Sequence, residues 1–153
     1  MTPMGMHTTY TKKFIDGDPQ YRYEDRFHIM FFSKPLCVKD FIDFLKVKNI
    51  KTVLEVGCSV GMFPRTFHDV CENMEYTGMD ILSKCVEICK SNMELEFLCG
   101  DFIKFKSEKK FDLVYSFDVI DHVCDIDGFI SNIVDVTKKY AYVNAYREDF
   151  ILI

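Results

Sequence analysis

Val53-Leu54-Glu55-Val56-Gly57-Cys58-Ser59-Val60-Gly61 is the most informative run in this chain of 153 residues. An apolar run that ends in glycine predicts a buried strand of a parallel sheet. Gly57 and Gly61 lie four positions apart, so the backbone can turn tightly there and approach a ligand closely. The helix expected after them offers unpaired N–H groups and the positive end of its dipole. The run therefore predicts a site for an anionic or nucleoside-bearing ligand.

Strands and helices are expected to alternate along the rest of the chain. After the strand at 53–57, the hydrophobic pattern predicts helices at 62–73, 83–92 and 126–138 and strands at 75–80, 95–98, 111–117 and 140–144. This alternation predicts an α/β fold with a doubly wound, mostly parallel sheet and right-handed crossovers. Ligands of such sheets bind beyond the carboxyl ends of the strands. The residues expected to meet there are Gly57, Asp80, Asp101 and Phe117.

Composition limits the classes of function. A formal net charge of −5 argues against a protein that binds nucleic acid through bulk electrostatics. The seven cysteines contain no CxxC pair, which indicates reduced thiols and no zinc site. No run approaches the roughly 20 apolar residues that a membrane-spanning helix needs, and the N-terminus has no targeting pattern. A cytoplasmic protein without a membrane partner is expected.

Three acidic residues are candidates for ligand binding. Asp80 follows Gly61 by 19 positions and ends the second strand, where a carboxylate can accept hydrogen bonds from ribose hydroxyls. Asp101 follows the third strand and can accept from an adenine amine, while Phe102 can pack on the base. Either acid alone is more typical of a cap or turn, but together they favour ligand contact. Glu55 interrupts an apolar strand and needs a partner, such as a ligand ammonium group bound directly or through water.

Four motifs in this order resemble those of class I S-adenosylmethionine-dependent methyltransferases. They are the run at 53–61, Gly78-Met79-Asp80, Gly100-Asp101-Phe102 and the segment 111–123, and the resemblance covers about residues 50–147. It implies a Rossmann-like methyltransferase fold, S-adenosylmethionine as cofactor and methyl transfer as the activity. It also implies these cofactor-binding residues, in addition to Glu55: Gly57, Cys58 and Gly61 at the methionine moiety, Asp80 at the ribose with Ile81 beside it, Asp101 and Phe102 at the adenine, and Ser116 and Phe117 in the cleft.

The chain departs from the family pattern at two places. Ser59 stands where the family loop has its middle glycine. The family sheet normally continues after its fifth strand with a helix and a final antiparallel pair, whereas this chain ends at Phe150-Ile151-Leu152-Ile153. The cofactor-binding domain, expected over residues 33–153, is therefore predicted to lack its C-terminal strands. The unpaired apolar edge would then be a place for a second copy or a partner chain.

The segment before this domain is expected to be an arm. Residues 1–32 are polar at first and then carry Tyr21, Tyr23, Arg26 and His28. This aromatic and basic composition, placed before the first motif, favours a lid over the cofactor. Ser33 and Pro35 then predict the start of a helix.

The methyl acceptor is expected to be a small molecule. DNA amino-methyltransferases carry an Asn/Asp-Pro-Pro-aromatic loop where this chain has Ser116-Phe117-Asp118-Val119, and no Pro-Cys dipeptide of a cytosine-ring enzyme occurs. Asp118 and His122 are candidate proton acceptors, although Asp121-His122 resembles a family pair that usually serves packing and capping. Two alternatives stay open: a cofactor-binding module that is inactive without a partner or further chain, and a dehydrogenase-like nucleotide-binding domain.

Overall fold

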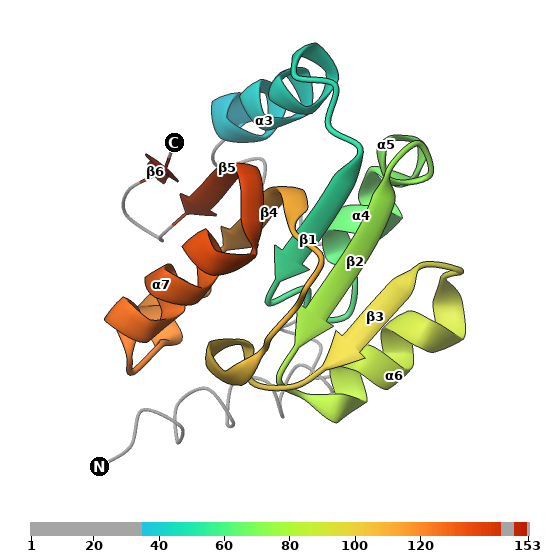
Figure 1. Cartoon of the computed structure of the whole chain (residues 1–153). Helices are drawn as coiled ribbons and strands as arrows, with labels where there is room; N and C mark the ends of the chain where they lie inside the picture. Colours follow the sequence, from blue (N-terminus) through green and yellow to red (C-terminus); the bar gives the residue numbers. More distant parts are fainter. Residues whose placement is uncertain (1–34, 145–148, 153) are drawn as a thin grey trace. The chain divides into compact units, whose positions relative to one another are not determined.

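The computed structural model describes residues 35–144 and 149–152, and the predicted arm at 1–32 lies outside them (Figure 1). The chain divides into two compact units, Met1–Ile50 and Lys51–Ile153. The described part of the first unit contains helix α3 (Pro35–Val47). Pro35 stands in the first turn of α3, as the sequence predicts, because a missing N–H is harmless there.

The second unit is built on one six-stranded sheet. Its strands are β1 (Thr52–Val56), β2 (Glu75–Asp80), β3 (Glu96–Cys99), β4 (Phe111–Phe117), β5 (Thr137–Asn144) and β6 (Asp149–Leu152). Their order is β3-β2-β1-β4-β5-β6, and β1 to β5 pair in parallel. The predicted mostly parallel, doubly wound sheet is confirmed, and its switch point lies between β1 and β4.

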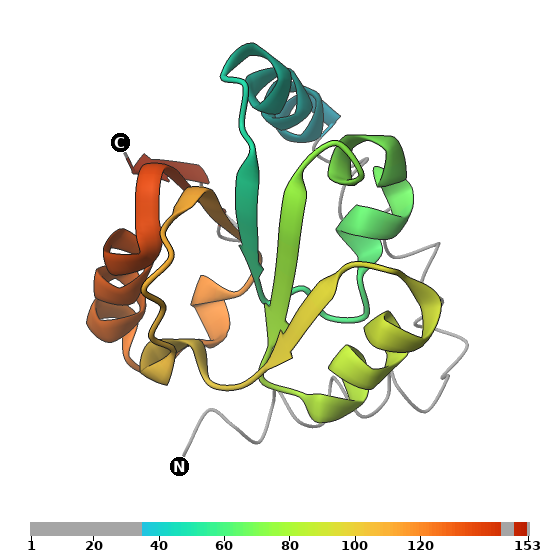
Figure 2. The same ribbon diagram turned by 45° about the vertical axis from the view of Figure 1, so that its right-hand side comes forward.

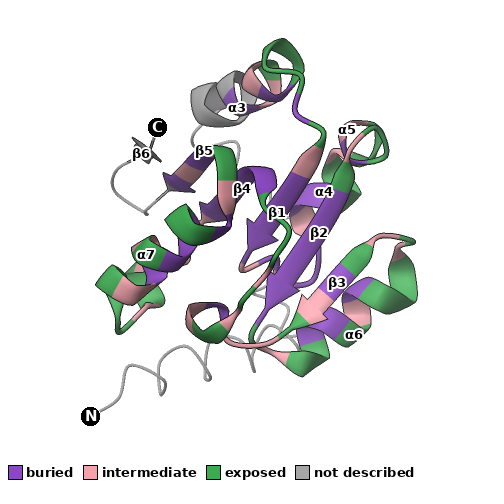
Figure 3. Cartoon of the chain, in the orientation of Figure 1, coloured by how far each residue is buried: buried purple, intermediate pink, exposed green. Residues whose placement is uncertain are grey.

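Helices cover both faces of this sheet. Figure 2 shows α7 (Ile126–Val136) on one side, and α4 (Met62–Thr66), α5 (His68–Cys71) and α6 (Ser83–Asn92) on the other. The α7 side buries a continuous apolar core that includes Leu54, Val56, Val114, Phe129 and Ile133. Figure 3 shows that β1 and the middle of the sheet are buried. Strands buried on both faces explain the continuous apolar run that opens the sequence argument.

One predicted helix is interrupted. The segment 62–73 forms two short helices because Phe67 adopts φ −111° and ψ 43°, outside the helical region. The N–H groups of Val70 and Cys71 both donate to the carbonyl of Phe67, so the second helix starts again at once. In contrast, α6 has the predicted bounds.

The prediction that the chain lacks every C-terminal strand is wrong. β6 pairs antiparallel with β5, with Ala141 opposite Leu152 and Asn144 opposite Asp149. Four residues separate these two strands in the sequence, which suits an antiparallel connection but is far too short for a parallel crossover. The edge of β5 that was expected to be exposed is therefore covered by the chain itself.

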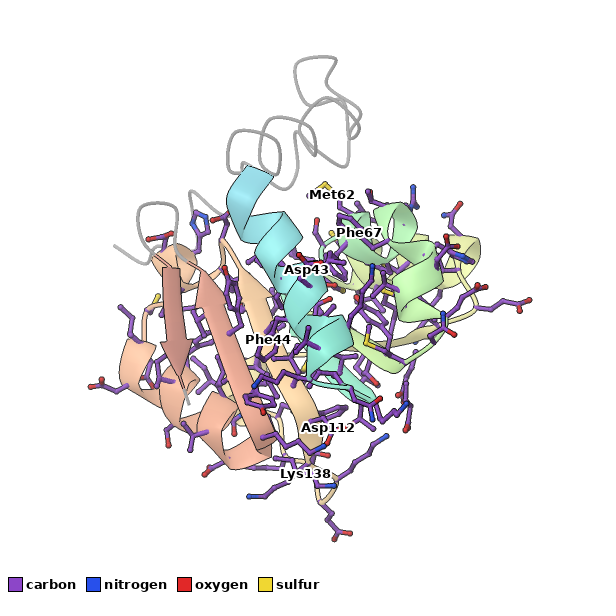
Figure 4. All side chains as sticks on the ribbon, turned by 90° about the horizontal axis from the view of Figure 1, so that it is seen from above. Asp43, Phe44, Met62, Phe67, Asp112 and Lys138 are labelled. Atoms are coloured by element: carbon purple, nitrogen blue, oxygen red, sulfur yellow. The ribbon has the colours of Figure 1, made fainter. Side chains whose placement is uncertain are left out.

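Asp112 fastens the amino ends of three strands. Its carboxylate accepts hydrogen bonds from the N–H groups of Lys51 (3.0 Å) and Thr52 (3.4 Å), and from Lys139 Nζ at 3.1 Å. Burial opposes ionisation, but these three donors hold the pKa of Asp112 below its usual value. Figure 4 shows Asp112 near the strand end that carries Lys138, away from Met62. This anchor lies at the sheet edge opposite the glycine turn.

Candidate functional site

The glycine turn joins β1 to α4 through three left-handed residues. Gly57, Ser59 and Gly61 have φ values of 80°, 51° and 79°. The N–H groups of Gly57 and Cys58 donate to the carbonyl of Met79 at 2.8 and 3.0 Å. The turn follows β1 at the switch point, where such sheets bind ligands, and these two bonds attach it to the end of the neighbouring strand β2.

Both glycines are required for space as well as for conformation. A Cβ on Gly57 would overlap Val119 Cγ2, which belongs to the segment after β4. A Cβ on Gly61 would overlap Met93 Cε, just past the end of α6. The turn therefore lies in direct contact with two segments far away in the sequence, and a side chain at either position would require its neighbour to move.

Ser59, the departure from the family pattern, is held from three sides. Its N–H donates to Asp80 Oδ2 at 2.8 Å. Its carbonyl accepts from Cys89 Sγ at 3.3 Å and from Cys58 Sγ at 3.6 Å. A left-handed conformation is unfavourable for a residue with a Cβ. The surrounding bonds therefore keep Ser59 in a conformation that glycine would adopt freely.

Asp80 links the turn to the next helix. In addition to the Ser59 N–H, its carboxylate accepts from the N–H of Leu82 at 3.0 Å. Asp80 is buried, whereas the apolar side chain of Ile81 beside it is 56% exposed. The structure places Asp80 against the glycine turn, as the sequence predicts. Its contact with a ribose, and that of Ile81 with the cofactor, stay predictions.

Asp101 and Phe102 lie at the adjoining strand end. The N–H of Gly100 donates to the carbonyl of Asp80 at 2.9 Å, which joins the ends of β2 and β3. Asp101 caps the short 3-10 helix η2 (Phe102–Lys104) by accepting from Ile103 N–H at 3.1 Å. The ring of Phe102 is buried in the core against Phe129, with centroids 5.4 Å apart. Asp101 thus has the capping role that the sequence offered as the alternative to ligand contact. The contacts of Asp101 and Phe102 with an adenine stay predictions.

Ser116 and Phe117 end β4. Ser116 is fully buried, and its hydroxyl has no hydrogen-bond partner among the described residues. Such a buried hydroxyl is unfavourable by about 1–3 kcal/mol, and it calls for an explanation. Phe117 is half-buried, and its ring contacts those of Phe63 and Tyr142 at 5.9 and 5.7 Å.

The two candidate proton acceptors, Asp118 and His122, lie in the segment that follows β4. Asp118 is a half-buried residue with a left-handed φ of 53°. His122 is exposed in the short helix η3 (Ile120–His122). Between them, Val119 packs over Gly57, so this segment adjoins the glycine turn. Their proximity to the turn agrees with the predicted site, but their catalytic role stays a prediction.

Glu55 has partners that sequence reasoning missed. Tyr76 from β2 and Tyr115 from β4 both donate their hydroxyls to Glu55 Oε2, the latter at 3.3 Å. All three side chains are buried. Burial raises the pKa of Glu55 to about 7, although the two phenols lower it and Asp80 raises it further. The sequence did contain a signal for these partners, because each of the two predicted strands next to β1 carries a buried tyrosine, Tyr76 or Tyr115.

The cysteines near the turn are protected from reaction. All six described cysteines are free thiols. Burial raises the pKa of Cys85 to about 12, with the charge of Asp80 adding to it. The hydrogen bond between Cys58 and Cys89, together with burial, raises the pKa of Cys58 far above the ordinary range. Neutral buried thiols are poor nucleophiles, so Cys58 serves packing and hydrogen bonding in this turn.

The fold and the turn define a Rossmann-like ligand-binding domain. The profile of a family described as a methyltransferase domain matches residues 53–140, which is more than half of the chain. The chain belongs to this family, and the resemblance to class I methyltransferases noted from the motifs is confirmed. No helix among the described residues is long and apolar enough to cross a membrane.

Curated relatives include two kinds of O-methyltransferase. A ubiquinone biosynthesis O-methyltransferase of Pelagibacter ubique (strain HTCC1062) is 28% identical over 99 residues, or 61% of this chain and 40% of that protein. A malonyl-[acyl-carrier protein] O-methyltransferase 1 of Ilyobacter polytropus is 29% identical over 102 residues, or 62% of this chain and 38% of that protein. The chain thus spans about two fifths of the length of these relatives.

Solved structures share the fold. The plantazolicin methyltransferase BpumL, in complex with a pentazolic desmethylPZN analog and SAH, has a TM-score of 0.68 at 14% identity; the match covers 90% of this chain and 58% of that one. Magnesium protoporphyrin IX methyltransferase (ChlM) from Synechocystis PCC 6803, with bound SAM, has a TM-score of 0.65 at 17% identity. This match covers 89% of this chain and 69% of that one. At these identities the likeness shows the fold alone.

Proposed function

We propose that this chain is the cofactor-binding part of an S-adenosylmethionine-dependent methyltransferase that acts on a small molecule. The observation that carries the proposal is the left-handed turn at 57–61, fastened to Asp80 at the switch point of a methyltransferase-family fold. The comparisons give no support to the dehydrogenase-like alternative.

The chemistry of the described residues fits this cofactor. Asp80 and Asp101 place carboxylates at the ends of adjacent strands, where they can accept from ribose hydroxyls and an adenine amine. The fully buried Ser116 hydroxyl, without a partner among the described residues, is a further polar group at the same edge. The residues that would hold the cofactor are Glu55, Gly57, Cys58, Gly61, Asp80, Ile81, Asp101, Phe102, Ser116 and Phe117.

The cofactor supplies an activated methyl group on a sulfonium. The protein then has to align the acceptor, exclude water and, for a hydroxyl acceptor, remove a proton. Asp118 and His122 are the proposed proton acceptors, since their segment adjoins the glycine turn. The names of the relatives favour an oxygen atom as the acceptor.

Calorimetry tests the proposal directly. We expect this chain to bind S-adenosylhomocysteine and not NAD. Binding of NAD alone would contradict the proposal. If S-adenosylhomocysteine binds but no oxygen acceptor is methylated, the chain is a binding module that needs further chain or a partner for activity.

A further inference from the structure

Asn132 is a polar residue on the buried face of α7. The rest of that face is apolar and consists of Phe129, Ile133 and Val136, and Asn132 is only 3% exposed. A buried amide is unfavourable unless its donors and its acceptor are paired. Asparagine is also a poor residue for a helix interior. Core packing alone therefore does not explain an asparagine at this position.

The amide of Asn132 is paired with the segment that contains η2. Asn132 Nδ2 donates to the carbonyl of Phe102 and also to that of Phe105, the latter at 3.0 Å. Asn132 Oδ1 accepts from Lys106 Nζ at 3.4 Å. Carbonyls only accept and an ammonium group only donates, so these partners fix the orientation of the amide. Figure 2 shows the turn at 102–104 beside α7.

The turn η2 has few hydrogen bonds of its own. The N–H of Lys104 donates to the carbonyl of Asp101 at 3.0 Å, and the N–H of Phe105 donates to that of Phe102 at 3.1 Å. Bonds of a 3-10 helix have poor geometry, and a helix of one turn is marginal in isolation. The shape of η2 therefore depends on what holds it from outside.

Two anchors hold the turn from outside. At its start, the bond from the N–H of Gly100 to the carbonyl of Asp80 ties the chain to the sheet. At its end, Asn132 holds it from α7. The carbonyl of Phe105 lies at the end of this short helix, where such a group has no partner within the helix. Loss of the Asn132 amide would free the end of η2 and leave its start attached.

Asp101 depends on the geometry of this turn. Its Oδ1 accepts from the N–H of Ile103 at 3.1 Å, inside η2. Its Oδ2 lies 3.7 Å from Nζ of Lys104, a side chain that is 85% exposed and that a ligand can displace. A contact between this carboxylate and a base amine needs precise placement, because a shift of about 1 Å is costly in a positioned group.

We propose that Asn132 is a positioning residue for base recognition: from α7 it holds the turn that presents Asp101, and so sets the preference for a base that carries an exocyclic amine. This inference rests on the proposed function, which supplies the ligand and the contact of Asp101 with the base. Asn132 itself touches no part of the ligand in this proposal.

The test measures the binding of two ligands to the whole chain by calorimetry. They are S-adenosylhomocysteine and S-inosylhomocysteine, whose base carries an oxygen in place of the amine. The ratio of the two affinities reports the contact of Asp101 with the amine. We expect the wild-type chain to prefer S-adenosylhomocysteine by more than about tenfold, because the oxygen cannot donate to a carboxylate.

Two substitutions of Asn132 test its role. Asn132→Leu keeps the side-chain size but removes the amide, so we expect the ratio to fall about threefold or more. Asn132→Ser keeps a hydroxyl that can donate to one of the two carbonyls, so its ratio should lie between those of the wild type and Asn132→Leu. A merely structural role would lower thermal stability and weaken both ligands equally, and an unchanged ratio overturns the proposal. If Asn132→Leu fails to fold, Asn132→Ser decides the matter.

Val136→Ala is the matched control on the same helix. It removes volume from the same buried face of α7 and keeps the amide. It should lower stability and leave the ratio at the wild-type value. A fall in this variant equal to that in Asn132→Leu would assign the effect to general loosening of α7 and overturn the role of Asn132.

A double-mutant cycle links Asn132 to Asp101. Asp101→Ser keeps an oxygen suited to capping and removes the carboxylate. In this background Asn132→Leu should leave the ratio unchanged, because the carboxylate through which it acts is absent. A further fall in the ratio would contradict the proposed linkage.

The wild-type measurement separates this inference from the proposed function. Binding of S-adenosylhomocysteine with no preference over S-inosylhomocysteine overturns the base contact of Asp101 and the role of Asn132, and leaves the proposed function standing. Absence of binding of S-adenosylhomocysteine overturns the proposed function and this inference with it.

Discussion

Two backbone N–H groups of the described chain donate to the carboxylate of Asp80. They belong to Ser59 in the glycine turn and Leu82 at the start of α6. A carboxylate held in this way stabilises the turn whether or not a ligand is present. The same residue therefore contributes to folding and, in the proposed function, to recognition of the ribose.

Asp80→Ala should weaken the binding of S-adenosylhomocysteine by about 1–3 kcal/mol, the range for a hydrogen bond to a charged group. It should also lower the free energy of unfolding, because two N–H groups lose their acceptor. Isothermal calorimetry and urea unfolding measure the two effects.

Asp112→Asn is the control for Asp80→Ala, since it removes a charge from the opposite edge of the sheet. It should lower stability and leave ligand affinity unchanged. Equal losses of affinity in the two variants would contradict a local role for Asp80.

Glu55 should make the stability of the ligand-free protein depend on pH. Burial raises its pKa from 4.5 to about 7 in the folded state, so its contribution is complete below pH 4.5 and lost as pH rises through about 7. Relative to Glu55→Gln, the wild-type free energy of unfolding should fall by about 3 kcal/mol between pH 4.5 and 8. Urea unfolding across this range measures the difference, and parallel curves for the two proteins would exclude a buried, proton-binding Glu55.

At the scale of elements, the glycine turn depends on what packs over it. Val119 covers Gly57 from the segment after β4, and Met93 covers Gly61 from the end of α6. Val119 is β-branched and stiff, whereas the end of a methionine side chain adapts easily. The two glycines therefore differ in how well their surroundings can yield to a methyl group.

Gly57→Ala should be more destabilising than Gly61→Ala. Both variants carry the strain of a left-handed φ, but only the first forces the rigid Val119 to move. We expect a loss of more than about 1 kcal/mol in each case, with the larger loss at Gly57. Denaturant unfolding of the two variants gives the order, and the reverse order would show that Met93, not Val119, is the tighter neighbour.

At the scale of the whole molecule, the chain itself covers the outer side of β5. β6 covers β5, so the described chain presents no unpaired β5 edge for a partner. This finding removes the reason that the sequence offered for a second copy or partner chain at that place. The proposed lid at residues 1–32 lies outside the described residues and remains a proposal.

Deletion of residues 1–32 tests the lid. If the aromatic and basic arm closes over the cofactor, the shortened chain should bind S-adenosylhomocysteine more weakly and release it faster. Calorimetry and stopped-flow dissociation measure these effects. Circular dichroism checks that the remaining chain is folded, and unchanged affinity in a folded chain would remove the lid.

Much of the fold follows from local patterns. The bounds of β2, β4 and α6 are those predicted from hydrophobic periodicity, glycine and polar punctuation. The convergence of Asp80 and the turn at 57–61 follows from the geometry of parallel sheets, in which strand ends meet at one edge. The break at Phe67 could not be predicted, because no proline or glycine stands there to mark it.

The sequence by itself determined the five parallel strands, the glycine turn and the family, since each of these has a signal in a short stretch of residues. Only the tertiary structure decided which groups Glu55 contacts and that β6 pairs with β5. Tyr76 and Tyr115 lie 21 and 60 positions from Glu55. Such contacts depend on the register between strands. The hydrophobic pattern within a single strand does not predict how that strand aligns with its neighbours. For that reason the sequence indicated that Glu55 needs a partner, whereas the two tyrosines that serve as its partners were identified only from the folded chain.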